Sequence, residues 1–210
     1  MNFRSDPVPI DSEATYELSG AFRMKPQPSR LIFGVLLYDR QKRLIQSIHV
    51  NSVKGTETVL AAACTEADRI IKVKDASSWR PRQRVAFGAE DQLPNFRVTG
   101  MVDSGYQSGD IWLIKLREPC GFDVPAGTRI IAHRAGNNGA FPCVGDVPQE
   151  WTQWRGEVTS TMLKRWPGAT FASVVMLPTL PPGGKGEFFA DDVVLRRQST
   201  SHRGTSSGRP

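Results

Sequence analysis

The chain has 210 residues, 39% of them hydrophobic and 23% charged, which is enough to bury a core without disulfide or metal staples. Its 27 basic and 21 acidic residues give a net charge of +6, but they are spread along the chain without a basic cluster or a nucleic-acid-binding motif. This distribution favours a role in solubility over nucleic-acid binding, so we expect no nucleic-acid partner. The chain has no apolar run of about 18 residues, so we expect no membrane insertion.

The first half of the chain begins with strand patterns. Residues 1–13 lack the apolar core of a secretory signal, which predicts synthesis in the cytoplasm, and their alternating Val8 and Ile10 predict an extended first strand. Apolar and polar residues alternate over 15–24, which predicts a half-buried strand. Residues 30–50 hold two apolar runs around the polar turn DRQKR, which predicts a β-hairpin.

The rest of the chain continues mainly in short strands. Residues 58–68 fit either a short helix, which their alanines favour, or a strand with a turn. A long loop is expected over 135–151, a tight turn at 181–186 and a disordered Ser/Gly/Arg-rich tail over 198–210. Gly- and Pro-containing turns separate further predicted strands within 69–88, 95–105, 110–119, 122–134, 151–161, 169–180 and 187–197. This spacing indicates a barrel or a sandwich.

Three segments resemble the galactose-binding-like jelly-roll modules, a group that includes many carbohydrate-binding modules. They are IDSEATYELSGAFR (10–23), LIFGVLLYDRQKRLI (31–45) and EFFADDVVLRR (187–197), and WTQWRGEV (151–158) is similar to the strand that carries a core tryptophan. The middle of the chain instead resembles a small β-barrel insert. The expected fold is therefore all-β: a jelly-roll β-sandwich formed by 1–56 and 135–197, an inserted small β-barrel-like subdomain formed by 57–134, and the tail.

The resemblance also bears on assembly. Modules of this type have a further segment before the strand at 15–24, whereas this chain begins only 15 residues earlier. Compared with these modules, the chain is therefore expected to lack one strand of the sandwich, which would leave a sheet edge open. Because an open edge can pair with another chain, we expect a homo-oligomer or a larger protein assembly.

A metal site is implied near the last strand. Alternation places Asp191 on the face of Val193 and Leu195, so it is expected to point inward and to need a partner. Similar modules hold a structural calcium there, with oxygen ligands from an early loop, which Asp11 or Glu13 could supply. The alternative is a hydrogen-bonded turn aspartate.

Aromatic side chains in predicted loops are candidates for stacking on sugar rings. The expected glycan-binding set consists of Tyr106, Phe141 and Trp151, with the donors Arg134, Asn137 and Asn138. Trp79 is expected to cover the core, Trp112 and Trp154 belong to strand patterns, and Trp166 fits either interpretation.

No catalytic set is apparent. His49, His133 and His202 are far apart in sequence, and no nucleophile elbow or marked carboxylate pair is present, so the sequence predicts no enzyme. The three cysteines leave at least one thiol outside any intramolecular pair, and a Cys120–Cys143 disulfide is an alternative to a fully reduced chain.

Three functional interpretations follow. The first is a non-catalytic carbohydrate-binding attachment module whose partner is a glycan or cell-surface polysaccharide, for example on a virion surface. The second is a structural assembly protein, such as a phage capsid-decoration or tail component held by partner subunits. The third is a polysaccharide-degrading enzyme.

Overall fold

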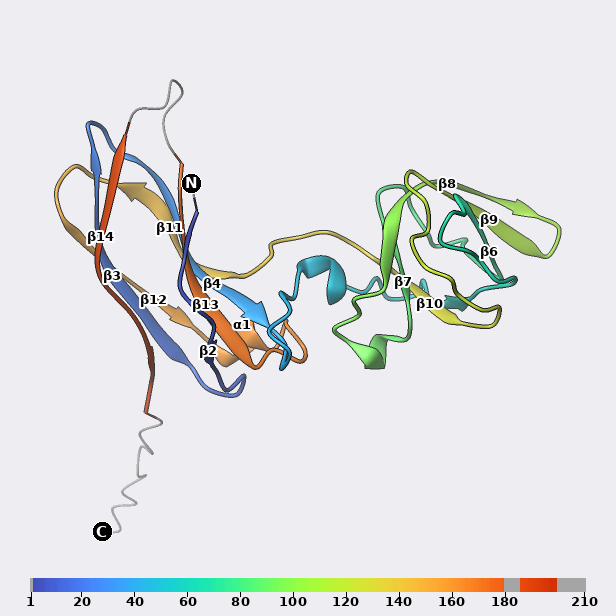
Figure 1. Cartoon of the computed structure of the whole chain (residues 1–210), viewed down its shortest axis with the longest axis horizontal. Coiled ribbons are helices and arrows are strands. Elements are labelled where there is room, and N and C mark those ends of the chain that lie inside the picture. The colour runs from blue at the N-terminus through green and yellow to red at the C-terminus, as the bar shows by residue number, and fades with distance from the viewer. Residues whose placement is uncertain (1, 180–185, 200–210) are drawn as a thin grey trace, which may run out of the picture.

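A computed structural model describes residues 2–179 and 186–199, and within them the chain is all-β with one short α-helix (Figure 1). The sandwich strands are β1 (Phe3–Arg4), β2 (Val8–Pro9), β3 (Tyr16–Lys25), β4 (Ser29–Tyr38), β11 (Ala140–Val147), β12 (Thr152–Val158), β13 (Phe171–Pro178) and β14 (Glu187–Arg197). The others are β5 (Thr58–Val59), β6 (Ile70–Val73), β7 (Arg84–Phe87), β8 (Val98–Ser108), β9 (Ile111–Leu116) and β10 (Arg129–His133). The helix α1 (Ser160–Leu163) begins at Thr159, whose hydroxyl accepts a hydrogen bond from the Met162 amide.

Two antiparallel sheets form a β-sandwich. The first has the order β1-β13-β4-β11, with β2 also paired to β13, and the second has the order β12-β3-β14. Figure 1 shows the sheets as two layers, with β3, β12 and β14 on one side and β4, β11 and β13 on the other. The predicted all-β sandwich is confirmed, whereas its assignment to the galactose-binding-like jelly rolls stays a prediction.

Alternation along the central strands fills the sandwich core. Leu18 and Phe22 on β3, and Phe33 and Leu37 on β4, are completely buried. The rings of Phe22 and Phe33 meet edge to face across the two sheets, with centroids 4.9 Å apart. Because successive side chains of a strand point to opposite faces, the intervening residues lie on the outer faces, where ligands can reach them.

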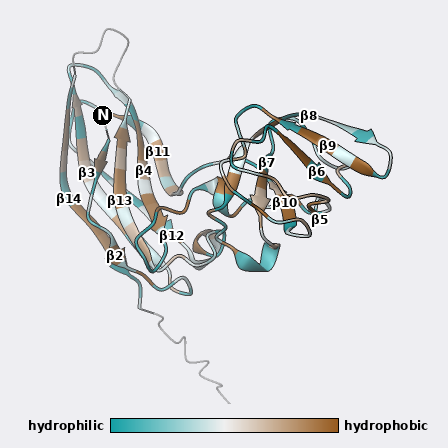
Figure 2. Ribbon diagram, turned by 45° about the vertical axis from the view of Figure 1, so that its right-hand side comes forward, coloured by the Kyte–Doolittle hydropathy of each residue, from teal (hydrophilic) through white to brown (hydrophobic). Residues whose placement is uncertain are grey.

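The six remaining strands form a third antiparallel sheet in the order β5-β10-β7-β8-β9-β6. Leu60 bridges to Val73, and hydrogen bonds from Ala61 N to Lys72 O and from Lys74 N to Val59 O join the two ends of this sheet. The sheet therefore closes into a small barrel with its own apolar core, which includes Ile71, Val85 and Ile114. Figure 2 shows hydrophobic stretches on strands of both parts and a hydrophilic turn at Glu90–Gln92.

All six barrel strands lie between residues 58 and 133, inside the segment that the sequence assigns to an insert. The assignment of 57–134 to an inserted subdomain stays a prediction. One loop of the barrel part packs on the sandwich: Asn95 N donates to His49 O at 2.8 Å, and the partly buried Phe96 packs against the sandwich core.

Two sequence predictions about secondary structure are wrong. The second arm of the 30–50 hairpin is not a strand, because only Leu44 bridges back to Tyr38 before a 3-10 turn at Ser47–His49. The region 135–151 is not a long loop, because it contains β11. The register of β11 shifts between Ala140 and Cys143, and Pro142 within this irregularity lies on an edge strand, where a missing N–H is tolerated.

Of the two structures predicted for residues 58–68, a short helix or a strand with a turn, the second is the one observed. Thr58–Val59 form β5, and Cys64 bridges to Val124, so the alanines there do not form a helix. The predicted turn at 181–186 and the tail over 198–210 lie largely outside the described residues. No helix in the described part of the chain has the length and apolar character needed to cross a membrane.

Candidate functional site

An open groove of about 770 Å³ lies on the outer face of the first sheet. Its floor is apolar, because Leu36 on β4 and Val175 and Leu177 on β13 alternate outward, opposite the core residues of the same strands. The rim is polar and brings together segments that are distant in sequence. Its members are Asn2, Arg4, Asn137 and Asn138.

Phe141 forms the aromatic wall of this groove. Its side chain lies over Gly34, where an added Cβ would collide with the Phe141 ring and with Ala140 O. Gly34 therefore lets Phe141 lie close to the sheet, and Phe141 remains half-buried at the groove. Asn137 and Phe141 also line a second hollow of about 300 Å³, together with Arg165 and Trp166.

The loop that carries the two asparagines is held by a buried serine. Ser47 N and Ser47 Oγ both donate to Asn138 Oδ1 at 3.1 Å. Gly136 O, 3.0 Å from Ser47 Oγ, is the alternative acceptor for the single hydroxyl proton, and Ser47 Oγ accepts a hydrogen bond from Gly136 N at 2.8 Å. Because Asn138 Oδ1 accepts these bonds, its amide nitrogen is the end of the side chain left to donate to a ligand.

The structure brings together only part of the predicted glycan-binding set. Phe141, Asn137 and Asn138 share the groove. Arg134 is exposed but does not line it, and Tyr106 is 56% exposed on the β8–β9 hairpin of the barrel part. Sequence reasoning missed Arg4 and Asn2, because their place in the groove depends on the pairing of Arg4 with Val175 across β1 and β13.

Trp151 belongs to a different surface, the outer face of the second sheet. The guanidinium of Arg23 lies 4.9 Å from the Trp151 ring and 4.5 Å from the Phe189 ring. This stack brings together side chains of β3, of β14 and of the residue before β12. The remaining tryptophans are structural: Trp79, whose Nε1 donates to Thr56 O, and Trp166 are buried, and Trp112 and Trp154 pack against the two cores.

The predicted inward orientation of Asp191 is wrong. A bulge between Asp191 and Val194 adds one residue to β14, with Asp192 in the left-handed region at φ 48°. Counting back from Leu195 by strict alternation therefore gives the wrong face for Asp191, which is exposed and accepts a hydrogen bond from Asp192 N at 2.9 Å. This arrangement matches the turn-aspartate alternative.

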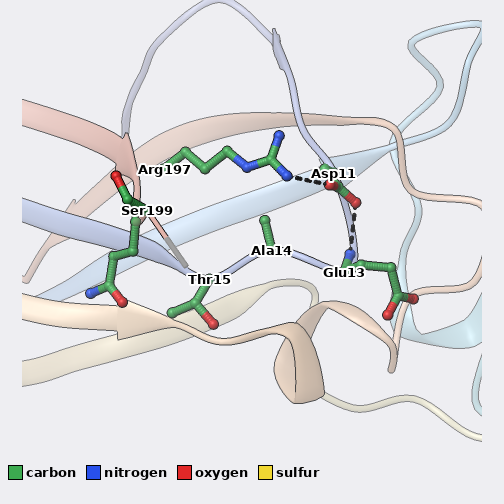
Figure 3. A pocket seen from close by; sticks show the side chains of 7 residues that line it. Asp11, Glu13, Ala14, Thr15, Arg197 and Ser199 are labelled. Carbon is green, nitrogen blue, oxygen red and sulfur yellow. Dashed lines mark hydrogen bonds and ion pairs between the residues drawn. The ribbon is translucent and has the colours of Figure 1, made fainter. Parts of the chain in front are cut away.

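Asp11 and Glu13 do not meet Asp191. Figure 3 shows Arg197 reaching Asp11, whose carboxylate it contacts at 2.7 Å, while Asp11 also accepts from Glu13 N at 2.9 Å. Asp191 pairs with Ala21, whereas Arg197 pairs with Tyr16. These two positions of β3 are five residues apart, which corresponds to roughly 17 Å along the strand. No group of three His, Cys, Asp or Glu side chains suited to a metal occurs within 2–179 and 186–199.

Two histidines that are distant in sequence are neighbours in space. His133 is completely buried, its Nδ1 donates to Ile48 O at 2.7 Å, and its Nε2 is buried without a partner among the described residues. Burial lowers the pKa of His133. The pKa of His49 is also lowered, mainly by burial and to a smaller extent by the charge of His133. His202 lies outside the described residues.

All three cysteines are free thiols, and their placement does not allow the alternative Cys120–Cys143 pairing. Cys64 and Cys120 lie together in the barrel core, whereas Cys143 is in the core of the sandwich. A Cys120–Cys143 disulfide is therefore incompatible with this arrangement, because the two thiols belong to different cores.

Comparison of this chain with protein-family models, curated proteins and solved structures gave no match.

Proposed function

We propose that this protein binds a glycan without chemical turnover in the groove on the first sheet. The observation that carries the proposal is the convergence of one aromatic ring, two amides and a guanidinium over an apolar floor: Phe141, Asn137, Asn138 and Arg4. Sugar rings present apolar C–H faces and polar hydroxyl edges, so recognition needs both kinds of surface in one place.

Each part of the groove has a role in this proposal. Phe141 stacks on a sugar face, and the amides of Asn137 and Asn138 bind hydroxyl groups. The charged residues lining the two hollows are Arg4 and Arg165, both of them cationic. We therefore expect preference for an acidic polysaccharide, such as one that contains uronic acids, over a neutral one of the same length.

Affinity electrophoresis against acidic and neutral polysaccharides tests the proposal, followed by calorimetry with the best ligand. Phe141→Ala should weaken binding at least tenfold, which corresponds to about 1.4 kcal/mol. Tyr106→Ala is the matched control, because Tyr106 is an exposed aromatic outside the groove. The groove is not a glycan site if no polysaccharide retards the protein, or if the two folded variants lose the same amount of binding affinity.

The assembly hypothesis would use an unpaired sheet edge, and β14, which like β12 pairs with β3 alone among the described strands, is one such edge. This edge carries a bulge and the charged residues Glu187, Asp191, Asp192, Arg196 and Arg197. Bulges and charges are the features by which natural sheets prevent edge-to-edge pairing. We therefore rank glycan binding ahead of assembly. Light scattering on the full chain distinguishes the two hypotheses, because a monomer favours glycan binding and a defined oligomer favours assembly.

A further inference from the structure

Two thiols face each other inside the barrel part of the protein. The Sγ atoms of Cys64 and Cys120 are 3.4 Å apart, and the two residues are 4% and 1% exposed. Nearby apolar residues include Val124 and Phe122, whose carbonyl oxygen lies 3.4 Å from Cys120 Sγ. The proposed function makes no use of this pair.

The backbone holds both cysteines in place. Cys64 and Val124 exchange two hydrogen bonds, of 3.0 and 2.9 Å, and Cys120 N donates to Asp68 O at 2.7 Å. Gly121 N donates to Glu66 O at 2.8 Å on the other side of the same contact. The proximity of the thiols therefore results from fixed pairing of two chain segments and does not depend on a chance rotamer of one side chain.

We propose that Cys64 and Cys120 form a disulfide that staples the barrel. A disulfide bond is about 2.05 Å long, so the sulfur atoms, now 3.4 Å apart, must approach by about 1.4 Å, which small side-chain rotations supply. The bond encloses β6, β7, β8 and β9, because all four strands lie between the two cysteines in sequence. It restricts the unfolded chain and thereby stabilises the barrel.

The timing of the reaction follows from burial. The pKa of Cys64 is raised to about 12, mainly by burial and to a smaller extent by the neighbouring Cys120. Little Cys64 thiolate therefore exists at neutral pH in the folded protein. A bulky oxidant also has little access to either sulfur. We therefore expect the bond to form while the chain folds, when both thiols are exposed, and only slowly afterwards.

The chemistry is two thiol–disulfide exchanges with a small disulfide such as oxidised glutathione. One cysteine thiolate attacks the glutathione disulfide, forms a mixed disulfide and releases one glutathione thiolate. The second cysteine thiolate attacks the protein sulfur of that mixed disulfide and releases the second glutathione. The protein loses two protons and two electrons, and one glutathione disulfide becomes two thiols.

Refolding of the full chain tests the proposal. The reduced, denatured protein is refolded with either a glutathione redox pair or excess dithiothreitol, and its remaining thiols are then alkylated in denaturant and counted by mass. Glutathione should leave one alkylated thiol, that of Cys143, and peptide mapping should find Cys64 linked to Cys120. Three alkylated thiols, a linkage that includes Cys143, or cross-linked dimers would overturn the proposal.

Variants and melting curves complete the test. Cys143→Ser should still form the cross-link, whereas Cys64→Ser and Cys120→Ser should not. The oxidised wild type should melt about 5–10 °C above the reduced wild type. This comparison within one sequence decides the matter even if a serine variant fails to fold, and equal melting temperatures would contradict a stabilising staple.

Discussion

The ring of Phe96 lies 4.7 Å from the ring of His49, centroid to centroid, and this contact joins the barrel part to the sandwich. The guanidinium of Arg43 lies 4.0 Å from the centroid of the same Phe96 ring. Pro94, from the same loop, lies so close to Gly168 that a Cβ there would be 2.7 Å from it. Residues of one loop therefore couple the two cores.

Removing the Phe96 ring should weaken this coupling. We expect Phe96→Ala to lower the free energy of unfolding by about 2 kcal/mol, because a partly buried ring and its cation–π contact are lost. Urea unfolding followed by tryptophan fluorescence measures the change. Tyr106→Ala, at an exposed position in the barrel, should change it by less than about 0.5 kcal/mol. Equal effects of the two variants would contradict the role of Phe96.

Acidification should destabilise the region around His133. Burial lowers the pKa of His133, and that of His49 is lowered by burial and then by His133, so the unfolded chain binds these protons more readily than the folded protein does. Their contribution to stability is therefore complete above the ordinary histidine pKa and is lost as pH falls below it.

The urea midpoint measured at pH 7.5 and at pH 5 tests this prediction. The wild type should lose stability at the lower pH, and His133→Asn, which keeps an amide donor near Ile48 O, should lose less. An identical pH dependence in the two proteins would exclude His133 as a cause.

The turn after β4 depends on one carboxylate. Asp39 accepts hydrogen bonds from Gln41 N, Arg43 N and Arg43 Nε at 2.9, 2.8 and 2.7 Å. Burial alone would raise the pKa of Asp39, but its hydrogen bonds with Arg43 and Gln41 and the Arg43 charge outweigh burial and lower it. Asp39→Ala should cost about 1–3 kcal/mol in thermal or urea unfolding. Asp110→Ala, at an exposed turn of the β8–β9 hairpin, should cost far less.

Gly34 should control both stability and the groove. Gly34→Ala places a methyl group against Ala140 O and the Phe141 ring, and the backbone oxygen cannot move freely. We expect a loss of about 1–3 kcal/mol in unfolding free energy and weaker glycan retention than in the wild type. Gly55→Ala is a useful comparison, because no atom lies within 4 Å of the added Cβ, although Gly55 has a positive φ of 77° and should show a strain cost of its own. If Gly34→Ala is as stable as the wild type, the close contact of Phe141 with Gly34 does not have the role proposed for it.

Local pattern was sufficient for most strands. The alternation over 15–24 predicts β3 because only one face of this strand is apolar, and Tyr16, Leu18 and Phe22 are indeed buried. The pattern failed where a strand contains proline and glycine, as in β11, and where Asp39 closes a turn without a returning strand. Those outcomes depend on edge position and on side-chain hydrogen bonds, which hydrophobic periodicity does not encode.

The sequence by itself determined the fold class, the packing of Trp79, Trp112 and Trp154 against the cores, and three members of the candidate groove: Asn137, Asn138 and Phe141. Only the tertiary structure decided that Arg4 joins them, that a bulge turns Asp191 outward, and that Cys64 lies against Cys120 and not near Cys143. The physical reason is that side-chain periodicity is a local property. Register, bulges and strand order result from pairing between distant segments, and these decide which side chains meet.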